Sequence, residues 1–496
     1  MVEYRAELHL SPASCYDRLL DFFHSPAVDV DVLTRRWVQR VMESLPVHRV
    51  AGRPVLLGDG LKVAKAGRKM PAVKLLHQPG ESNTKPTYIM GHSVQVVSAL
   101  VAAADSHFAV PLAGRIHEGV RFTNRDHRTL PSKCCDLLES LGLDEPFYFV
   151  ADAYYGCKTV AQRLRGSGSH LISRVRRSVV AYIPAPAPTG RRQRGRPRLY
   201  GRRIKLWTLF DSDQHSWQEA ESPVYGERDV TIRYLYRDLI RRPVRTLVRF
   251  VLVDHPTRGR SIFITTDLAL PPIEVIRLYG LRFKIELSFK QALSVLGTYA
   301  YHFWLRAMPK ISRGSGTQHL HRASERYRQA VRRKLSAYQR HIQVGAIAQA
   351  SLQALAIQHP RLVWSSFGSW LRGRPAAPRI AVRLQLRGTD RVSEVSLTMP
   401  IRAQSYASHP LMPVFVMNLP EGYLFNMIAR RLAKHEQVDD MRLLAITGRH
   451  QIGRLQFVEP GEQQETPPRI GLSQLLTRRG HVYSVTATVC WADLCR

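Results

Sequence analysis

The chain is 496 residues long, 44% of them hydrophobic, with 73 Lys and Arg against 39 Asp and Glu, a formal net charge of +34. This length and hydrophobic content allow about two to four folded domains. A basic excess of this size indicates a polyanionic partner, and nucleic acid is the first candidate; the alternative is a solvated basic surface.

No run approaches the roughly 20 apolar residues of a membrane helix, and the first residues lack the apolar core of a signal peptide. The cysteines show neither a CxxC pair nor a His/Cys zinc spacing, so we expect reduced thiols. They are Cys15, Cys134, Cys135, Cys157, Cys490 and Cys495. We therefore expect no membrane partner and a place in the cytoplasm, at the nucleoid.

The first half of the chain alternates helix and strand patterns. Two amphipathic helices are expected at 11–25 and 29–45. Short apolar runs bounded by turn residues then predict strands and helices in turn. Strands are expected at 54–59, 88–102, 107–116, 146–152 and 169–175, and helices at 130–141 and 158–165. This succession favours the α/β class with a mixed sheet.

The middle of the chain is β-rich, then helical. Residues 183–202 are rich in Pro, Gly and Arg and predict a loop. Strands are expected at 203–210, 230–238, 244–254 and 261–268, followed by one helix at 271–292 and a long basic helix or helix pair at 311–357. A Pro- and Arg-containing stretch at 371–379 predicts a linker to a small α+β module, with a strand at 392–401 and a helix at 421–436.

Three carboxylates stand out by their setting. Asp59 and Asp152 each end an apolar run, with small residues beside them, and Glu286 lies in the helix predicted at 271–292. Arg282 follows Tyr279 by three residues and Glu286 follows Arg282 by four, so on an α-helix the three side chains share a face. Three such carboxylates hold two Mg²⁺ ions, which prefer oxygen ligands. The alternative is that the aspartates are turn residues and the glutamate lies on a solvated helix face.

The helix carries the motif of a known family. The chain resembles a DDE transposase of the insertion-sequence-four superfamily, whose signature is Tyr-x2-Arg-x3-Glu-x6-Lys. Tyr279, Arg282 and Glu286 match it. The signature's lysine falls at Leu293, so the pattern departs there, and Lys290 is the nearest substitute.

The resemblance extends over roughly residues 1–372 and includes the sequences around Asp59 and Asp152. It implies an RNase H-like core in which Asp59, Asp152 and Glu286 hold Mg²⁺ or Mn²⁺. Water would cleave the phosphodiester at the end of a mobile element, and the freed 3′-hydroxyl would join target DNA. It also implies double-stranded DNA as partner and a homodimer holding two DNA ends.

The resemblance further implies that Tyr279, Arg282 and the substitute Lys290 contact DNA near the cut. A separate basic motif, Arg194-Gly195-Arg196-Pro197-Arg198, matches the core of an AT-hook, which lays arginines in the minor groove. The alternative is a basic loop with phosphate affinity only. We also expect phosphate contacts from a basic helical set: His319, Arg322, Arg326, Arg328, Arg332, Arg333 and Arg340. Lysines and arginines after the first aspartate are expected to line the same DNA channel: Lys62, Lys65, Arg68, Lys69 and Lys74.

The last hundred residues resemble the N-terminal subdomain of HipA-type toxin kinases, through SLTMP, the turn from Asn418 to Gly422, the run from Asp439 to Gly448 and the strand from Ile452 to Leu455. The kinase core that follows in such toxins is not in the sequence, so we expect no phosphotransfer. The module is either inert or contacts a partner, such as a DNA-binding antitoxin.

The expected organisation follows from these patterns. It comprises an N-terminal helical DNA-contacting region at 1–50, an RNase H-like catalytic core at 51–300 with a β-rich insertion at about 170–265, a basic helical part at 301–372 and the HipA-like module at 380–480. Two other functions stay open. One is an inactive fusion acting only as a DNA-binding or antitoxin-binding protein, and the other is a structure-specific nuclease without strand transfer.

Overall fold

The computed structural model describes residues 20–78, 86–104, 106–186, 198–212 and 216–365, together with the backbone of 455–458, 471–478 and 481–488. The chain divides into two compact units. One comprises residues 29–290 and 302–343, and the other comprises 1–28, 291–301 and 344–496.

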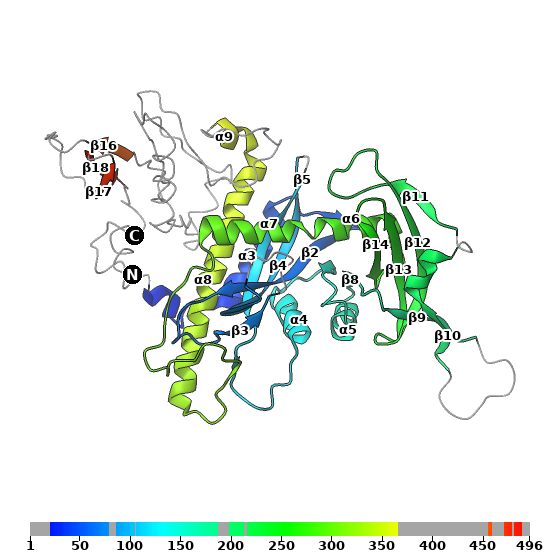
Figure 1. Ribbon diagram of the computed structural model, residues 1–496, viewed down its shortest axis with the longest axis horizontal. Helices are drawn as coiled ribbons and strands as arrows, with labels where there is room; N and C mark the ends of the chain where they lie inside the picture. The colour runs from blue at the N-terminus through cyan, green and yellow to red at the C-terminus, as the bar shows by residue number, and fades with distance from the viewer. Residues whose placement is uncertain are drawn as a thin grey trace. The chain divides into compact units, whose positions relative to one another are not determined.

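A mixed sheet of thirteen strands forms the centre of the first unit (Figure 1). In one part of it β4 lies between β5 and β2, antiparallel to both, while β7 and β8 continue from β2 in parallel. The order β5-β4-β2-β7-β8 with these directions is that of an RNase H-like fold, so the predicted mixed α/β class is confirmed. The bounds are β2 Arg53–Ala64, β4 Tyr88–Ala103, β5 Ser106–Ile116, β7 Tyr148–Ala151 and β8 His170–Arg174.

Helices join and cover these strands. α3 (Val30–Ser44) begins at Asp29, whose side chain accepts hydrogen bonds from the backbone N–H groups of Asp31 and Val32, a usual N-cap arrangement. α4 (Leu130–Ser140) leads into β7. α5 (Lys158–Gly166) forms the crossover between β7 and β8, which lets the two strands run parallel. The helices predicted at 29–45, 130–141 and 158–165 are confirmed. Residues 20–24 are helical, and residues 11–19 lie outside the described part.

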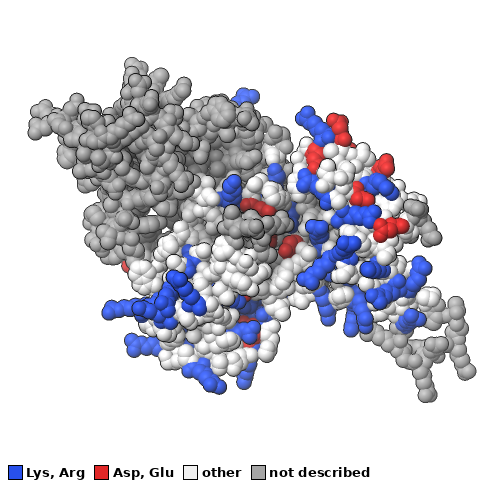
Figure 2. Space-filling model, viewed as in Figure 1, with Lys and Arg blue, Asp and Glu red and all other residues white. Residues whose placement is uncertain are grey.

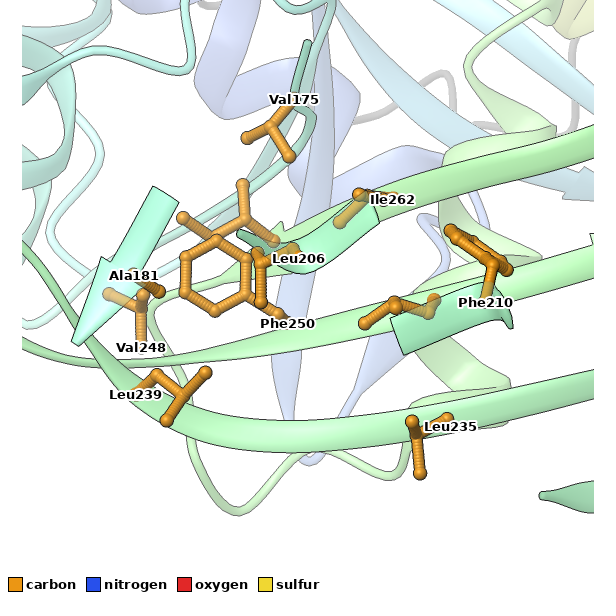
Figure 3. Packing of buried hydrophobic residues seen from close by; sticks show 11 residues of the cluster. Val175, Ala181, Leu206, Phe210, Leu235, Leu239, Val248, Phe250 and Ile262 are labelled. Atoms are coloured by element: carbon orange, nitrogen blue, oxygen red, sulfur yellow. The ribbon is translucent and has the colours of Figure 1, made fainter. Parts of the chain in front are cut away.

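The β-rich segment extends the same sheet. β14 pairs antiparallel with β8, and β13, β12, β9 and β10 follow outward. The bounds are β9 Val180–Pro184, β10 Tyr200–Lys205, β11 Gln218–Glu221, β12 Thr231–Arg241, β13 Thr246–His255 and β14 Gly259–Thr265. Phe250 lies at the centre of its hydrophobic cluster, together with Leu206, Val248 and Ile262 (Figure 3).

One predicted strand is partly wrong. Residues 203–205 belong to β10, but the following residues form a 3₁₀ helix, η1 (Leu206–Asp211). Leu206 and Phe210 are buried in the cluster while Trp207 and Leu209 pack against it, and a strand would turn alternate residues away from it. The tighter turn therefore buries more of this apolar run than a strand would.

Four short strands complete this unit. They are β1 Arg49–Val50, β3 Lys74–His77, β6 Val120–Arg121 and β15 Gln318–His319, and the last two pair in parallel. The helix predicted at 311–357 begins later, as α8 (Glu325–Gln358). Residues before it bond to a loop instead, with Leu305 N–H donating to the Lys69 carbonyl (2.8 Å) and Ile311 N–H to the Arg68 carbonyl (2.9 Å).

The second unit contains a π-helix, η2 (Ala292–Leu296), the end of α8 from Val344, and α9 (Pro360–Ser365). It also holds an antiparallel sheet of order β16-β18-β17, formed by Leu455–Val458, His481–Thr488 and Gly471–Arg478. The strand and helix predicted at 392–401 and 421–436 lie outside the described residues, as do the HipA-like motifs before Leu455. In the part of the chain that the structure describes, no helix has the length and apolar character needed to cross a membrane.

Candidate active site

Asp59 and Asp152 lie on neighbouring strands at the same level of the sheet. Gly58 of β2 is the register partner of Ala151 of β7 in a parallel pair, and each aspartate is the next residue. Neighbouring strands are about 4.8 Å apart, so the two carboxylates leave the sheet side by side. The prediction that Asp59 ends its strand is wrong, because β2 continues to Ala64 and Asp59 pairs with Val96 of β4.

Hydrogen bonds fix the loop that begins at Asp152. Its carboxylate accepts a hydrogen bond from the N–H of Tyr154 (3.0 Å). Its carbonyl accepts from the N–H of Tyr155 (3.1 Å) and from Oγ of Ser173 on β8 (2.7 Å). The aspartate is therefore held in place through both its side chain and its main chain.

The helix predicted at 271–292 is broken at the site. α6 (Pro272–Leu281) ends and α7 (Lys284–Gln291) begins after two intervening residues. The N–H of Arg282 donates to the carbonyl of Tyr279 (3.2 Å) and that of Phe283 to Gly280 (3.4 Å), which is the tighter 3₁₀ pattern. The break leaves Glu286 in the first turn of α7, four residues after Arg282.

Arg282 joins the first and third carboxylates. Its Nη1 donates to Oδ2 of Asp59 (2.7 Å) and its Nη2 to Oε1 of Glu286 (3.0 Å). The arginine side chain is 16% exposed, and its buried Nε has no hydrogen-bond partner. One guanidinium thus lies between two of the three carboxylates that the sequence singles out.

The electrostatics show three anions sharing one arginine. Burial raises the pKa of Asp59 to about 6; Arg282 and the Gly60 N–H oppose this, while Asp152 and Glu286 add to it. Burial alone would lower the pKa of Arg282, but Asp59, Glu286 and Asp152 are among the anions that raise it overall. The pKa of Asp59 therefore depends on the other two carboxylates, and the pKa of Arg282 depends on all three. Asp152 thus belongs to the same cluster.

Tyr279 lies in this cluster, and Lys290 does not. The Tyr279 ring packs against Phe263 at 4.7 Å, and the guanidinium carbon of Arg282 lies 5.7 Å from the ring centre. Burial raises the pKa of Tyr279. Lys290 is exposed near the end of α7 and, in the described part of the chain, forms no ion pair with the carboxylates. Leu293, where the signature has its lysine, is also exposed.

The donor set fits a divalent cation, although it is not arranged around one. Carboxylate oxygens are the ligands that Mg²⁺ prefers, and Asp59 and Glu286 already face a single cation, the guanidinium. Among the described residues no three His, Cys, Asp or Glu side chains are placed to share a metal ion. The position between two of the expected ligands is taken by Arg282.

The sequence did not single out three neighbours of the cluster. Arg174 ends β8 beside Asp152, since Ala151 and Ser173 are register partners, and it acts on the pKa of Tyr279. Tyr225 and Phe283 form an edge-on ring pair at 6.3 Å and are 54% and 43% exposed. Phe283 lies in the break between α6 and α7. The end of the strand at 169–175 was the available signal for Arg174.

The basic residues after Asp59 have intramolecular partners. Lys62 donates to the carbonyl of His77, Arg68 to that of Ile311 and Lys69 to that of Arg306. Lys74 pairs with Glu118, and Lys65 is buried. These contacts give the set a structural role, and its place along a DNA channel stays a prediction.

Elsewhere the surface stays basic. On the face shown in Figure 2 most charged side chains are Lys or Arg, including many over the β-rich segment. Of the AT-hook motif, Arg194 and Arg196 lie outside the described residues, and Arg198 donates from Nε to the carbonyl of Tyr200 (2.8 Å). In α8, Arg328 and Arg332 bond to Glu325, and Arg340 is buried.

Two family models match segments of the chain. Residues 4–239 match the family model of the DDE superfamily endonucleases, and residues 370–458 match that of the HipA N-terminal domain. No curated protein matches the chain.

Among solved structures, a piggyBac transposase synaptic complex with hairpin DNA is similar at 9% identity with a TM-score of 0.29. The match covers 60% of this chain and 47% of that one, so the chain spans about half of that transposase's length. The chain thus combines a segment similar to the DDE superfamily endonucleases with a segment similar to the HipA N-terminal domain, as its sequence predicts.

Proposed function

We propose that the protein is a DNA transposase of the insertion-sequence-four type, which cleaves the ends of a mobile element and joins them to target DNA. One observation carries the proposal. The register of β2 and β7 brings Asp59 and Asp152 side by side, and Arg282 links Asp59 to Glu286. Three carboxylates far apart in sequence thereby meet at one place in an RNase H-like sheet.

Asp59, Asp152 and Glu286 would hold Mg²⁺ or Mn²⁺. When bound, such ions lower the pKa of an attacking water or hydroxyl and stabilise the leaving oxygen. Asp152 is held by its loop and Asp59 by its strand, so their oxygens need little rearrangement on binding. Arg282 and Tyr279 would orient the phosphate at the cut, because a guanidinium binds phosphate through its forked donors.

Two reactions would follow in order. Hydrolysis at the element end breaks the phosphodiester bond and leaves a free 3′-hydroxyl. That hydroxyl then attacks a phosphate of the target in-line, forming one phosphodiester and releasing one target 3′-hydroxyl. Both steps transfer a phosphoryl group between oxygens, so one carboxylate site serves both.

DNA as the substrate also accounts for the net charge of +34. A homodimer is proposed because joining requires two element ends in one complex. The predicted domain boundaries at 1–50, 51–300, 301–372 and 380–480 form part of this proposal, as do DNA contacts by Arg194, Arg196 and Arg198. Binding to chromosomal DNA would place the protein at the nucleoid in the cytoplasm.

The HipA-like segment is proposed to act apart from the catalytic chemistry. Its match covers residues 370–458, and the element that the structure describes within it is β16 (Leu455–Val458). We propose that it contacts a DNA-binding antitoxin. Pull-down of a HipB-like antitoxin by the full chain, abolished when residues 380–480 are deleted, would support this contact.

The experiment uses a labelled DNA end taken from the inverted repeats that flank the coding region, with Mg²⁺, in the presence and absence of target DNA. Cleavage followed by joining is the expected result. Cleavage without joining would show a structure-specific nuclease instead. DNA binding without cleavage would show an inactive fusion that only binds DNA.

A further inference from the structure

Arg282 forms ion pairs with Asp59 and Glu286, two of the three carboxylates that the proposed function assigns to a metal. Both oxygens of Asp59 are taken, Oδ1 by the N–H of Gly60 (2.7 Å) and Oδ2 by Nη1 of Arg282 (2.7 Å). Nη2 of the same guanidinium reaches Glu286 (3.0 Å). A cation that bound Asp59 and Glu286 together would lie beside the guanidinium, whose positive charge repels it.

We propose that Arg282 closes the metal site in the DNA-free protein, and that a DNA phosphate opens it by taking the guanidinium away. This inference rests on the proposed function, because it assumes that Asp59, Asp152 and Glu286 hold a divalent cation. It adds a regulatory step: binding of metal waits for binding of DNA.

The contacts of Arg282 suit a residue that changes partner. Its Nε is buried without a hydrogen-bond partner, so the closed position leaves one donor unused, which costs free energy. Glu286, one of its two partners, is 43% exposed. The arginine also lies at the break between α6 and α7 rather than inside a continuous helix.

A phosphate offers what the closed position lacks. Guanidinium and phosphate form paired, charge-assisted hydrogen bonds. Once the arginine leaves, Asp59 and Glu286 lose the guanidinium that pairs with both, and a divalent cation then supplies more positive charge than the guanidinium did. The two ligands therefore favour each other's binding, and by linkage the effect is reciprocal.

The test measures Mn²⁺ binding by electron paramagnetic resonance, so it does not depend on catalysis. The full chain is compared with Arg282→Gln and with Arg277→Gln, without DNA and with a 30-base-pair duplex at about 100 µM, the weak end of the usual range of non-specific dissociation constants. Arg277→Gln is the matched control, because it removes the same charge five residues earlier, in α6, where Arg277 pairs with Glu274 (3.5 Å) and not with the cluster in the described structure. Thermal melting confirms that each variant is folded.

Without DNA, Arg282→Gln is expected to bind Mn²⁺ about tenfold more tightly than the wild type, within the range usual for coupled sites. Arg277→Gln should match the wild type. The duplex should strengthen Mn²⁺ binding to the wild type and leave Arg282→Gln unchanged. Adding Asp59→Asn to Arg282→Gln should abolish the gain.

The inference is overturned if folded Arg282→Gln binds Mn²⁺ no more tightly than the DNA-free wild type. In that case the closure fails while the proposed function stands. If the variant gains the Asp59-dependent site but the wild type never cleaves DNA, the closure stands while the proposed function fails. Absence of Mn²⁺ binding in every sample overturns both.

Discussion

Gly58 and Ala151 are opposite each other in the parallel pair of β2 and β7. This register decides which residues meet at the site, because a slip by one residue would turn Asp59 to the other face of the sheet. The close approach of the two strands depends on the glycine. A Cβ at Gly58 would lie 2.2 Å from the ring of Phe149, which is fully buried and has no room to move.

Gly58→Ala is therefore expected to lower the free energy of unfolding by about 1–3 kcal/mol through overpacking. The variant should also lose cleavage activity by more than its loss of folded protein explains, since Asp59 is the next residue. Urea unfolding and a cleavage assay on the folded fraction measure the two effects.

Gly166→Ala is the control for this change. Its added Cβ would meet nothing within 4 Å, and the residue lies at the end of α5, away from the cluster. Its stability should equal or exceed that of the wild type. Equal stability of Gly58→Ala and Gly166→Ala would contradict the packing argument.

Glu227 lies in the same turn as Tyr225, and the pH dependence of stability tests the hydrogen-bond network around its carboxylate. Its carboxylate accepts hydrogen bonds from Ser222 (2.7 Å) and Arg258 (2.7 and 3.0 Å) and contacts His255 (2.8 Å). The Ser222 hydroxyl, with Arg258 and His255, lowers the pKa of Glu227 from 4.5 to about 2. The ionised form thus stabilises the fold.

Since the folded pKa lies below the ordinary one, this stabilisation is complete above pH 4.5 and is lost as the pH falls towards 2. Glu227→Gln should cost about 1–3 kcal/mol at pH 7, as expected for hydrogen bonds to a charged group. The difference between wild type and variant in urea unfolding should shrink between pH 5 and pH 3. A difference as large at pH 3 as at pH 7 would argue against the network.

The exposed arginines of α8 should determine part of the salt dependence of DNA binding. Arg326 and Arg333 are exposed and have no ion pair in the described structure. Replacing both with alanine should weaken binding and reduce the slope of log K against log salt by about 0.9 for each DNA phosphate that is no longer neutralised. Fluorescence anisotropy at several salt concentrations measures the slope.

Arg68→Ala and Lys69→Ala should behave in the opposite way. Both side chains bond to carbonyls of the segment before α8, so their removal should lower the melting temperature and leave the salt slope unchanged. A reduced slope in either variant would show that these residues reach DNA after all.

The sequence predicted the core strands and helices because each is a strongly patterned run closed by turn residues. Strand β4, for example, is mostly apolar and is buried on both faces from Gly91 to Val101. Periodicity failed at η1, where Leu206 and Phe210 fit a strand or a helical turn equally well, and packing onto the cluster around Phe250 decided for the turn.

The three carboxylates were found from sequence because each had a local signal and a family motif supported them. The contact between Arg282 and Asp59 was not predicted, since a helical spacing shows that Arg282 is near Glu286 but not that it reaches Asp59, 223 residues away. The same holds for Arg174, which lies beside Asp152 only through the register of β7 and β8. Contacts across the sheet depend on register, and the local pattern does not encode it.

The most direct test of the central claim compares Asp59→Asn, Asp152→Asn and Glu286→Gln with the control Glu274→Gln. Glu274 lies in the first turn of α6 and pairs with Arg277, so its change removes one carboxylate from the same region without touching the cluster. Mg²⁺-dependent cleavage of the labelled DNA end is the measurement. The three variants should fall to about one-thousandth of the wild-type rate or less, because several kcal/mol of transition-state stabilisation are removed, with DNA affinity unchanged and Glu274→Gln fully active. Wild-type cleavage by any one of the three would contradict the claim that these carboxylates form the catalytic site.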